Sequence, residues 1–317
     1  MNIVYWTRMP LAQEEVTQRL RAQPGVHLSV CPTLVACMAA LPDADALILY
    51  NCSQQDAREL MGAVVERAQR LRWMHFLTAG REGFDAEQIP ARIEVTQVMG
   101  ASAPVVAEHA MALLLALGRR VPELLAQQAR HAWDRASVVP LLQSLEGRTL
   151  AIVGYGHIGH EVARRARAFR MHVVAVSRDG RHDALADEGR PLTALGDVLA
   201  RSDAIVLAIA QTPQTRRLMD AAAFARCRPG AVLVNVARGG IVDHAALHEA
   251  LASGRLAGAA LDVTDPEPLP ADHPLWRSPR LIVSPHVAVE GSPGTARRLA
   301  DGTLALLLRR MAGPASP

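Results

Sequence analysis

A glycine-rich segment is the part of the sequence whose spacing points most directly to chemistry. Three glycines form the pattern GxGxxG directly after the apolar segment LAIV and directly before the helix-like segment HEVARRARAF. Glycines so placed permit a tight turn, close approach of the backbone to a pyrophosphate, and close packing of helix on strand. The first turn of the helix adds unpaired N–H groups that favour an anion. The pattern predicts a dinucleotide site lined by Gly154, Tyr155, Gly156, His157, Ile158 and Gly159.

Two other interpretations of this segment remain open. A tight strand-to-helix turn needs no ligand, and the glycine loop of a methyltransferase also follows a first strand. The next apolar strand begins about 20 residues further on, as expected for a dinucleotide-binding unit, and this spacing favours that interpretation.

The end of that next strand bears on which dinucleotide binds. In this kind of fold an acidic residue there hydrogen-bonds the ribose 2′-OH, whereas an arginine accommodates a 2′-phosphate. Here the segment MHVVAVSRDG places Ser177 and then Arg178 at that point, with Arg181 close behind. These residues predict a preference for NADP(H), with NAD(H) possible. Asp179 keeps the alternative open, because a slightly shifted turn would present its carboxylate to a ribose; Arg178 could also be an ordinary surface arginine.

Composition excludes several classes of function. The chain has 317 residues, of which 50% are hydrophobic, enough for one large or two medium domains. The net charge is +3, and the arginines are spread from Arg8 to Arg310, so no nucleic-acid partner is expected. All 34 basic residues are arginine. The lack of lysine excludes a lysine base, a Schiff base and a Walker-type phosphate site.

The cysteines and apolar segments indicate a cytoplasmic protein. Four cysteines have neither the spacing of a metal site nor that of a disulfide framework, so we expect no bound metal. The amino-terminal segment lacks the apolar core of a signal peptide. The longest apolar run, MALLLAL, is too short to span a bilayer, and no membrane partner is expected.

Two series of alternating strands and helices predict an α/β fold with parallel sheets. In the first series we expect strands at 2–6, 44–50 and 72–80 and helices at 11–25 and 56–71. A long apolar helix over 100–120 follows, and we expect it to be buried between two domains. Six strands fit the second series, from 149 to 288, and the last helix, 294–311, is expected to pack on the first domain.

Nearly the whole chain resembles the D-isomer-specific 2-hydroxyacid dehydrogenase family. The segments that carry the resemblance appear in the family's order: TAGREGFD, VVAEHAMALLLAL, LEGRTLAIVGYGHIG, TPQTRRLMD, PGAVLVNVARGGIVDHAALHEAL and GAALDVTDPEPLPADHPLWRSPRLIVSPHVA. The resemblance implies two doubly wound parallel-sheet domains, a Rossmann cofactor domain inserted into a flavodoxin-like substrate domain. We expect residues 1–99 and 288–317 to form the substrate domain and 100–287 the dinucleotide-binding domain. It also implies a homodimer, with the region of the long apolar helix as interface.

Three residues look like the family's catalytic set: Arg238, Glu267 and His286. The planar guanidinium of Arg238 can bind the carboxylate of a 2-keto acid and polarise its carbonyl. Hydride from a nicotinamide would attack that carbonyl carbon, and His286 can supply the proton that the developing alkoxide needs. Glu267, bonded to the other ring nitrogen, would fix the tautomer and favour the imidazolium. All three follow predicted strands, at the edge where ligands bind in open α/β sheets.

The resemblance extends to further positions. Asp262 resembles the family residue that meets the nicotinamide carboxamide, although a polar cap at a strand end would explain it equally well. Cofactor contacts are also expected from Ala210, Thr212 and Ala237. Substrate contacts are expected from Ala79, Gly80, Arg81 and Met99, together with Arg238. Arg81 departs from the family, which usually has a small apolar residue there; it would either bind a second acidic group of the substrate or point to solvent.

The sequence therefore predicts an NADP(H)-preferring reductase that converts a small 2-keto acid, such as glyoxylate or hydroxypyruvate, to the D-2-hydroxy acid. Two alternatives remain: an NAD-dependent family member acting on another 2-hydroxy acid, and a nucleotide-sensing binding protein similar to corepressors of the same fold. Formate dehydrogenases, which also resemble the family, carry Gln where Glu267 stands.

Overall fold

The computed structural model describes residues 1–84 and 86–312. The chain divides into two compact units. Unit 1 comprises Met1–Ala101 and the segment from Glu290 onward, and unit 2 comprises Ser102–Val289. Both are α/β units with a parallel sheet, which confirms the predicted fold class.

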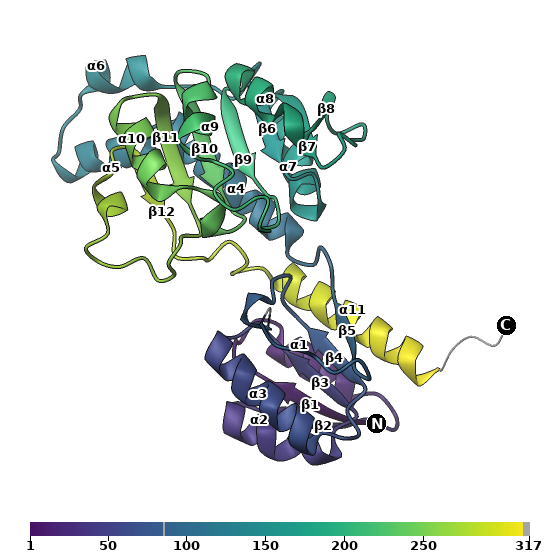
Figure 1. Ribbon diagram of the computed structural model, residues 1–317. Helices are drawn as coiled ribbons and strands as arrows, with labels where there is room; N and C mark the ends of the chain where they lie inside the picture. The colour runs from purple at the N-terminus through teal and green to yellow at the C-terminus, as the bar shows by residue number, and fades with distance from the viewer. Residues whose placement is uncertain (85, 313–317) are drawn as a thin grey trace. The chain divides into compact units, whose positions relative to one another are not determined.

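Unit 1 is built on a five-stranded sheet in the order β2-β1-β3-β4-β5 (Figure 1). The strands are β1 (Asn2–Trp6), β2 (His27–Cys31), β3 (Ala46–Leu49), β4 (Trp73–Phe76) and β5 (Glu94–Gln97). Helices α2 (Leu34–Ala40) and α3 (Gln54–Arg67) pack on one face. Helices α1 (Gln13–Arg21) and α11 (Pro293–Met311) pack on the other, so the last helix joins the first domain's core. Central strands such as β3 are buried along their whole length because helices cover both faces.

Unit 2 is built on a seven-stranded sheet in the order β12-β11-β10-β9-β6-β7-β8. The strands are β6 (Thr149–Val153), β7 (His172–Ser177), β8 (Glu188–Pro191), β9 (Ala204–Leu207), β10 (Ala231–Asn235), β11 (Leu256–Leu261) and β12 (Leu281–Val283). The strand order reverses direction between β6 and β9. In open α/β sheets ligands bind at the carboxyl ends of the strands beside such a reversal.

Helices cover both faces of this second sheet (Figure 1). On one face lie α4 (Ala103–Gly118) and α7 (His157–Ala168). On the other lie α8 (Leu195–Arg201), α9 (Ala221–Arg226) and α10 (His244–Ala252). Two further helices, α5 (Val121–Ala129) and α6 (Arg135–Val138), follow α4. Short 3-10 turns occur at Leu41–Asp43, Glu82–Phe84, Val139–Leu141, Leu192–Ala194, Gly239–Ile241 and Pro274–Arg277.

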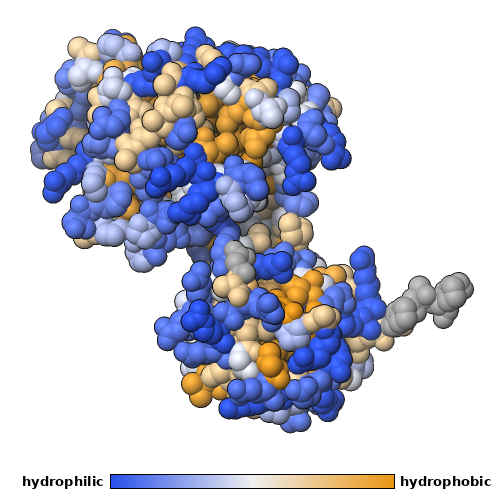
Figure 2. Space-filling view, in the orientation of Figure 1, coloured by the Kyte–Doolittle hydropathy of each residue, from blue (hydrophilic) through white to orange (hydrophobic). Residues whose placement is uncertain are grey.

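Three strands, β2, β5 and β8, and four helices, α2, α5, α6 and α9, were not expected from the sequence. β5 and β8 are edge strands with no fully buried residue, and β8 contains both Gly and Pro, so neither has the apolar signal of a strand. β2 is half exposed, and α2 has only seven residues. Among the described residues no helix is long and apolar enough to cross a membrane, and hydrophilic residues cover most of the visible face in Figure 2.

Candidate active site

The glycine turn joins β6 to α7, and its three glycines have different surroundings. Gly154 has φ +100°, and a Cβ there would lie 2.5 Å from the backbone of Ala208, just after β9. A Cβ on Gly159 would lie 2.1 Å from the carbonyl oxygen of Gly154. Around Gly156, by contrast, a Cβ would meet no described atom within 4 Å. Gly154 and Gly159 thus close the turn against the sheet, and Gly156 leaves the backbone open to a ligand.

This turn suits the pyrophosphate of a dinucleotide. Gly156 is the N-cap of α7 and has no side chain to bond the first N–H groups of the helix. Those donors and the positive end of the helix dipole favour a phosphate. Gly156 and His157 are exposed residues, so a phosphate could approach this turn closely. The residues present therefore fit a nicotinamide dinucleotide.

The turn after β7 contains the residues expected at the ribose. Ser177 Oγ donates to the carbonyl oxygen of Arg181 at 3.0 Å. The Nε of Arg181 lies 2.5 Å from Oδ2 of Asp179. Partial desolvation raises the pKa of Asp179, but the hydrogen bonds and charge of Arg181 outweigh it and hold that pKa below its usual range. Arg178 is exposed between them. The carboxylate that could have favoured a ribose hydroxyl is thus paired with an arginine.

Glu267 and His286 form a hydrogen-bonded ion pair. Nδ1 of His286 lies 2.9 Å from Oε2 of Glu267, and the backbone N–H of Thr264 donates to the other carboxylate oxygen at 3.0 Å. The bond to Glu267 raises the pKa of His286, against a smaller opposing effect of burial. Burial opposes ionisation of Glu267, but the bonds from His286 and Thr264 lower its pKa. Both pKa shifts favour the charged forms of the two side chains, which are half exposed to solvent.

Arg238 lies in the turn after β10, beside that pair. A Cβ on Gly239 would lie 1.9 Å from the carbonyl carbon of Thr264. Only glycine at this position therefore lets the Arg238 turn contact the segment that leads from Thr264 to Glu267. The charge of Arg238 lowers the pKa of both Glu267 and His286. The structure therefore brings together the three residues that the sequence proposed as catalytic.

Asn235 positions the Arg238 turn and was missed by the sequence analysis. It is fully buried at the end of β10. Its Nδ2 donates to the carbonyl oxygen of Arg238 at 2.9 Å, and its Oδ1 accepts from the N–H of Ala237 at 3.0 Å. A polar residue at the end of an otherwise apolar strand was the signal that could have identified it.

Asp262 holds the loop that carries His286. Its Oδ1 accepts from Ser284 Oγ at 2.7 Å and from the N–H of Val287 at 3.1 Å, and its Oδ2 accepts from the N–H of Ala288 at 3.1 Å. The N–H of His286 donates to the carbonyl oxygen of Asp262 at 2.8 Å. His286 has φ 53°, a left-handed conformation that costs a non-glycine residue about 1–3 kcal/mol and persists only where neighbours enforce it. We name these groups the Asp262 clamp.

His109 of α4 completes the clamp. Its Nε2 lies 3.2 Å from Oδ1 of Asp262 and 3.1 Å from Oγ of Ser284. The sequence analysis missed both His109 and Ser284, although both stand in the quoted family segments. The contact of Asp262 with a nicotinamide carboxamide stays a prediction.

The turns at the same sheet edge hold three other expected cofactor residues: Ala210, Thr212 and Ala237. Thr215 closes the turn after β9: its Oγ1 donates to the carbonyl oxygen of Ala210 at 2.8 Å and accepts from the N–H of Thr212 at 2.7 Å. Ala237 is buried in the Arg238 turn. Their contacts with a cofactor remain predictions.

The expected substrate residues Ala79, Gly80, Arg81 and Met99 belong to unit 1. Thr78 Oγ1 donates to the carbonyl oxygen of Gly80 at 2.8 Å, and Gln97 Nε2 donates to that of Ala79 at 3.1 Å. These bonds fix the turn after β4. Arg81 and Met99 are exposed. The role of these residues in binding a substrate stays a prediction.

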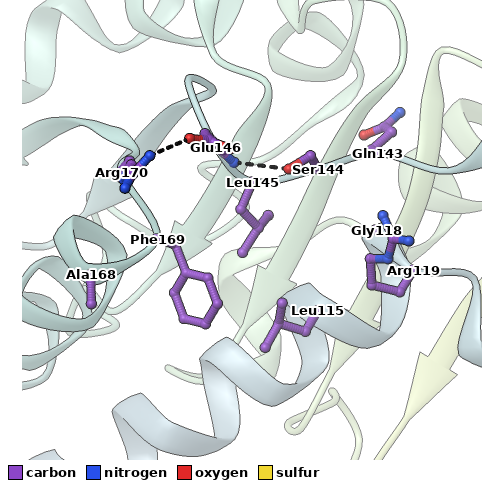
Figure 3. Close-up of a pocket in the computed structure, with 10 residues that line it drawn as sticks. All are labelled: Leu115, Gly118, Arg119, Gln143, Ser144, Leu145, Glu146, Ala168, Phe169 and Arg170. Atoms are coloured by element: carbon purple, nitrogen blue, oxygen red, sulfur yellow. Dashed lines mark hydrogen bonds and ion pairs between the residues drawn. The ribbon is translucent and has the colours of Figure 1, made fainter.

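A hollow in unit 2 lies apart from these groups (Figure 3). It has a volume of about 370 Å³ and is lined by the ends of α4 and α7 and by the segment before β6, including Leu115, Phe169 and Glu146. Since α7 starts at the glycine turn, its carboxyl end lies at the opposite edge of the sheet. Among the described residues, no group of His, Cys, Asp and Glu is arranged to hold a metal ion.

Comparison with known proteins supports the sequence resemblance. A family model described as "D-isomer specific 2-hydroxyacid dehydrogenase, NAD binding domain" matches residues 111–288. The chain is 36% identical to D-3-phosphoglycerate dehydrogenase of Mycobacterium tuberculosis over 265 residues, 83% of this chain and 49% of that protein. It is 34% identical to glyoxylate reductase of Korarchaeum cryptofilum over 273 residues, 85% of this chain and 80% of that one. The phosphoglycerate dehydrogenases matched are about twice as long as the part that the chain covers.

A solved structure is similar along nearly the whole chain. It is a D-isomer specific 2-hydroxyacid dehydrogenase family protein from Aeromonas salmonicida, with a TM-score of 0.86 and 30% sequence identity. The similarity covers 98% of this chain and 96% of that one.

Proposed function

Because the chain belongs to the D-isomer specific 2-hydroxyacid dehydrogenase family, we propose that it reduces a small 2-keto acid to the D-2-hydroxy acid with hydride from a nicotinamide dinucleotide. The observation that carries this proposal is the His286–Glu267 pair, 2.9 Å apart, beside Arg238 at the carboxyl edge of the seven-stranded sheet. A proton donor, its carboxylate partner and a guanidinium are the groups that reduction of a 2-keto acid requires.

The proposed mechanism assigns one task to each side chain. Arg238 binds the substrate carboxylate and polarises the neighbouring carbonyl. His286, protonated and bonded to Glu267 through Nδ1, gives the proton on Nε2 to the alkoxide. The bound nicotinamide supplies the hydride. When Nε2 has lost its proton, Nδ1 of His286 keeps its proton and its hydrogen bond to Glu267. The histidine therefore keeps one tautomer and one orientation.

We further propose that the cofactor is NADP(H) in preference to NAD(H). No carboxylate stands at the last residue of β7, where Ser177 is found, and Arg178 and Arg181 follow. Arg181 also neutralises Asp179, so the turn has no unpaired negative charge to repel a 2′-phosphate.

Glyoxylate and hydroxypyruvate are the proposed substrates. Similarity to a glyoxylate reductase, of which the chain covers 80%, supports a two- or three-carbon keto acid. The chain is also 36% identical to D-3-phosphoglycerate dehydrogenases over about half of their length, so their substrate is the second candidate.

We also propose a homodimer, in which the α5–α6 segment meets a second copy of the chain. No residue of α5 is buried, and the apolar side chains of Leu125 and Trp133 are 59% and 96% exposed. Between α5 and the segment after it lies a hollow of about 660 Å³. The region expected as the interface was α4, but nine of its 16 residues are buried within the monomer. Sedimentation of Trp133→Ala against the wild type tests this interface, and an unchanged dimer would contradict it.

Steady-state kinetics with both cofactors and a panel of keto acids test the function. We expect kcat/KM for glyoxylate or hydroxypyruvate to exceed that for larger keto acids, and to be at least about tenfold higher with NADPH than with NADH. A chain that binds nicotinamide nucleotides but turns over no keto acid would overturn the enzyme proposal in favour of a nucleotide-sensing protein.

A further inference from the structure

Asp183 connects two segments of the cofactor site that lie far apart in the sequence. It follows the β7 turn, and its carboxylate reaches back to the glycine turn. Tyr155, between the first two glycines, donates from Oη to Oδ1 of Asp183 at 2.7 Å. Nε2 of His160, in the first turn of α7, lies 2.5 Å from Oδ2. The N–H of Leu185 adds a third bond at 3.0 Å.

The bonds within the β7 turn make it a compact unit. Ser177 bonds to the backbone of Arg181, and Arg181 bonds to the side chain of Asp179. On the other side the turn rests on β8: a Cβ on Gly189 would lie 2.1 Å from the carbonyl oxygen of Gly180. Asp183 follows Arg181 by two residues. A shift of Asp183 relative to the glycine turn would therefore also shift the arginines of the β7 turn.

Asp183, Tyr155 and His160 form a charged cluster. The rings of Tyr155 and His160 pack edge to face with centroids 5.8 Å apart. The hydrogen bond from Tyr155, together with those from Leu185 and His160, lowers the pKa of Asp183 to about 2 despite some desolvation. The carboxylate is thus an anion at neutral pH, able to accept from all three donors.

We propose that Asp183 is a positioning residue for cofactor choice: it fixes the turn that carries Arg178 and Arg181 against the glycine turn, so that a dinucleotide bound there through its pyrophosphate presents its 2′-phosphate to the arginines. This inference rests on the proposed NADP(H) preference. Preorganised groups bind more tightly because less conformational entropy is lost on binding. Since NADH has no 2′-phosphate, release of the turn costs affinity for NADPH and little for NADH.

The test measures binding to the full chain by titration calorimetry, and hydrogen exchange of residues 178–187 without cofactor. In Asp183→Ala we expect the Kd for NADPH to rise about tenfold, that for NADH to change less than about twofold, and exchange in 178–187 to accelerate. Asp183→Asn keeps one acceptor oxygen for Tyr155 and should fall between Asp183→Ala and wild type. Glu146→Ala is the matched control, since it removes an exposed carboxylate paired with Arg170 at 2.8 Å, at the hollow of Figure 3.

Each outcome decides the proposal. An equal loss of affinity for both cofactors, an unchanged Kd for NADPH, or unchanged exchange in 178–187 would overturn the role of Asp183 alone, with the wild-type preference for NADPH intact. A wild type that binds NADH more tightly than NADPH would overturn the proposed cofactor and this inference with it.

Discussion

The carboxyl ends of β11 and β12, near the proposed catalytic residues, and that of β7, at the proposed ribose site, lie at the same edge of one sheet. Their polar groups are nevertheless held in different ways. The Asp262 clamp is buried: the Asp262 residue is 2% exposed, and its carboxylate meets two backbone N–H groups, a hydroxyl and His109. In the β7 turn (177–181), called the ribose turn below, the side chains of Asp179 and Arg181 are 46% and 89% exposed and bond chiefly to each other.

The difference indicates two different tasks. A buried donor left without its acceptor costs about 1–3 kcal/mol, so the clamp tolerates little change and fixes the geometry of His286. An exposed ion pair contributes about 0–1 kcal/mol and is screened by salt. The ribose turn can therefore vary without loss of the fold, and we expect substitutions there to change cofactor preference and substitutions in the clamp to change the rate.

Among substitutions that leave the His286 side chain in place, the largest effect is expected from Asp262→Asn. The amide nitrogen cannot accept from Val287 or Ala288, so a buried N–H loses its partner and His286 loses its imposed backbone conformation. We expect kcat to fall about 100-fold, and the free energy of unfolding to fall by about 1–3 kcal/mol in urea titrations. Asp197→Asn, which alters an exposed carboxylate paired with Arg226, is the control. A kcat within twofold of the wild type would contradict the clamp.

Substitution in the exposed turn should act on the cofactor alone. In Arg178→Ala we expect KM for NADPH to rise about tenfold and KM for NADH to stay within about twofold, because only NADPH offers a phosphate to the guanidinium. Steady-state kinetics with each cofactor give the comparison. Equal changes for both cofactors would remove Arg178 from the phosphate site.

Glu267→Gln tests the electrostatics of the catalytic edge through pH. Glu267 raises the pKa of His286, and reduction needs the protonated imidazole, so the rate of reduction falls as pH rises through that pKa. Without the carboxylate the pKa of His286 drops, and the fall in kcat/KM should move to lower pH. A pH profile with the same midpoint as the wild type would show that Glu267 does not control the proton.

The smallest difference between the two regions is expected in their response to salt. Raising NaCl from 0.05 to about 0.5 M shortens the Debye length to a few ångströms, so we expect KM for NADPH to increase a few-fold and more than KM for NADH. The kcat at saturating cofactor should change less, since the clamp is buried. A salt effect of equal size on both KM values would contradict the contrast between the regions.

The sequence predicted the features that are local and missed those that join distant segments. The glycine turn, the Ser177–Arg178 strand end and the three proposed catalytic residues each stand in a short pattern after an apolar strand. His109 and Ser284 are 175 residues apart, and only the folded sheet brings them to one carboxylate. Asp183 is 28 residues from Tyr155, in a polar segment with no pattern of its own. Edge strands such as β8 were missed because they lack buried apolar residues.

His286, held by Glu267 and the clamp, is the proposed proton donor for reduction of a 2-keto acid. The most direct test is a single turnover of glyoxylate at saturating NADPH, followed by the loss of NADPH absorbance, in the wild type, in His286→Ala and in the exposed control His27→Ala. We predict a rate about 10²–10⁴-fold lower in His286→Ala, with NADPH affinity unchanged and the control equal to wild type. A His286→Ala rate equal to that of the wild type would show that His286 is not the proton donor.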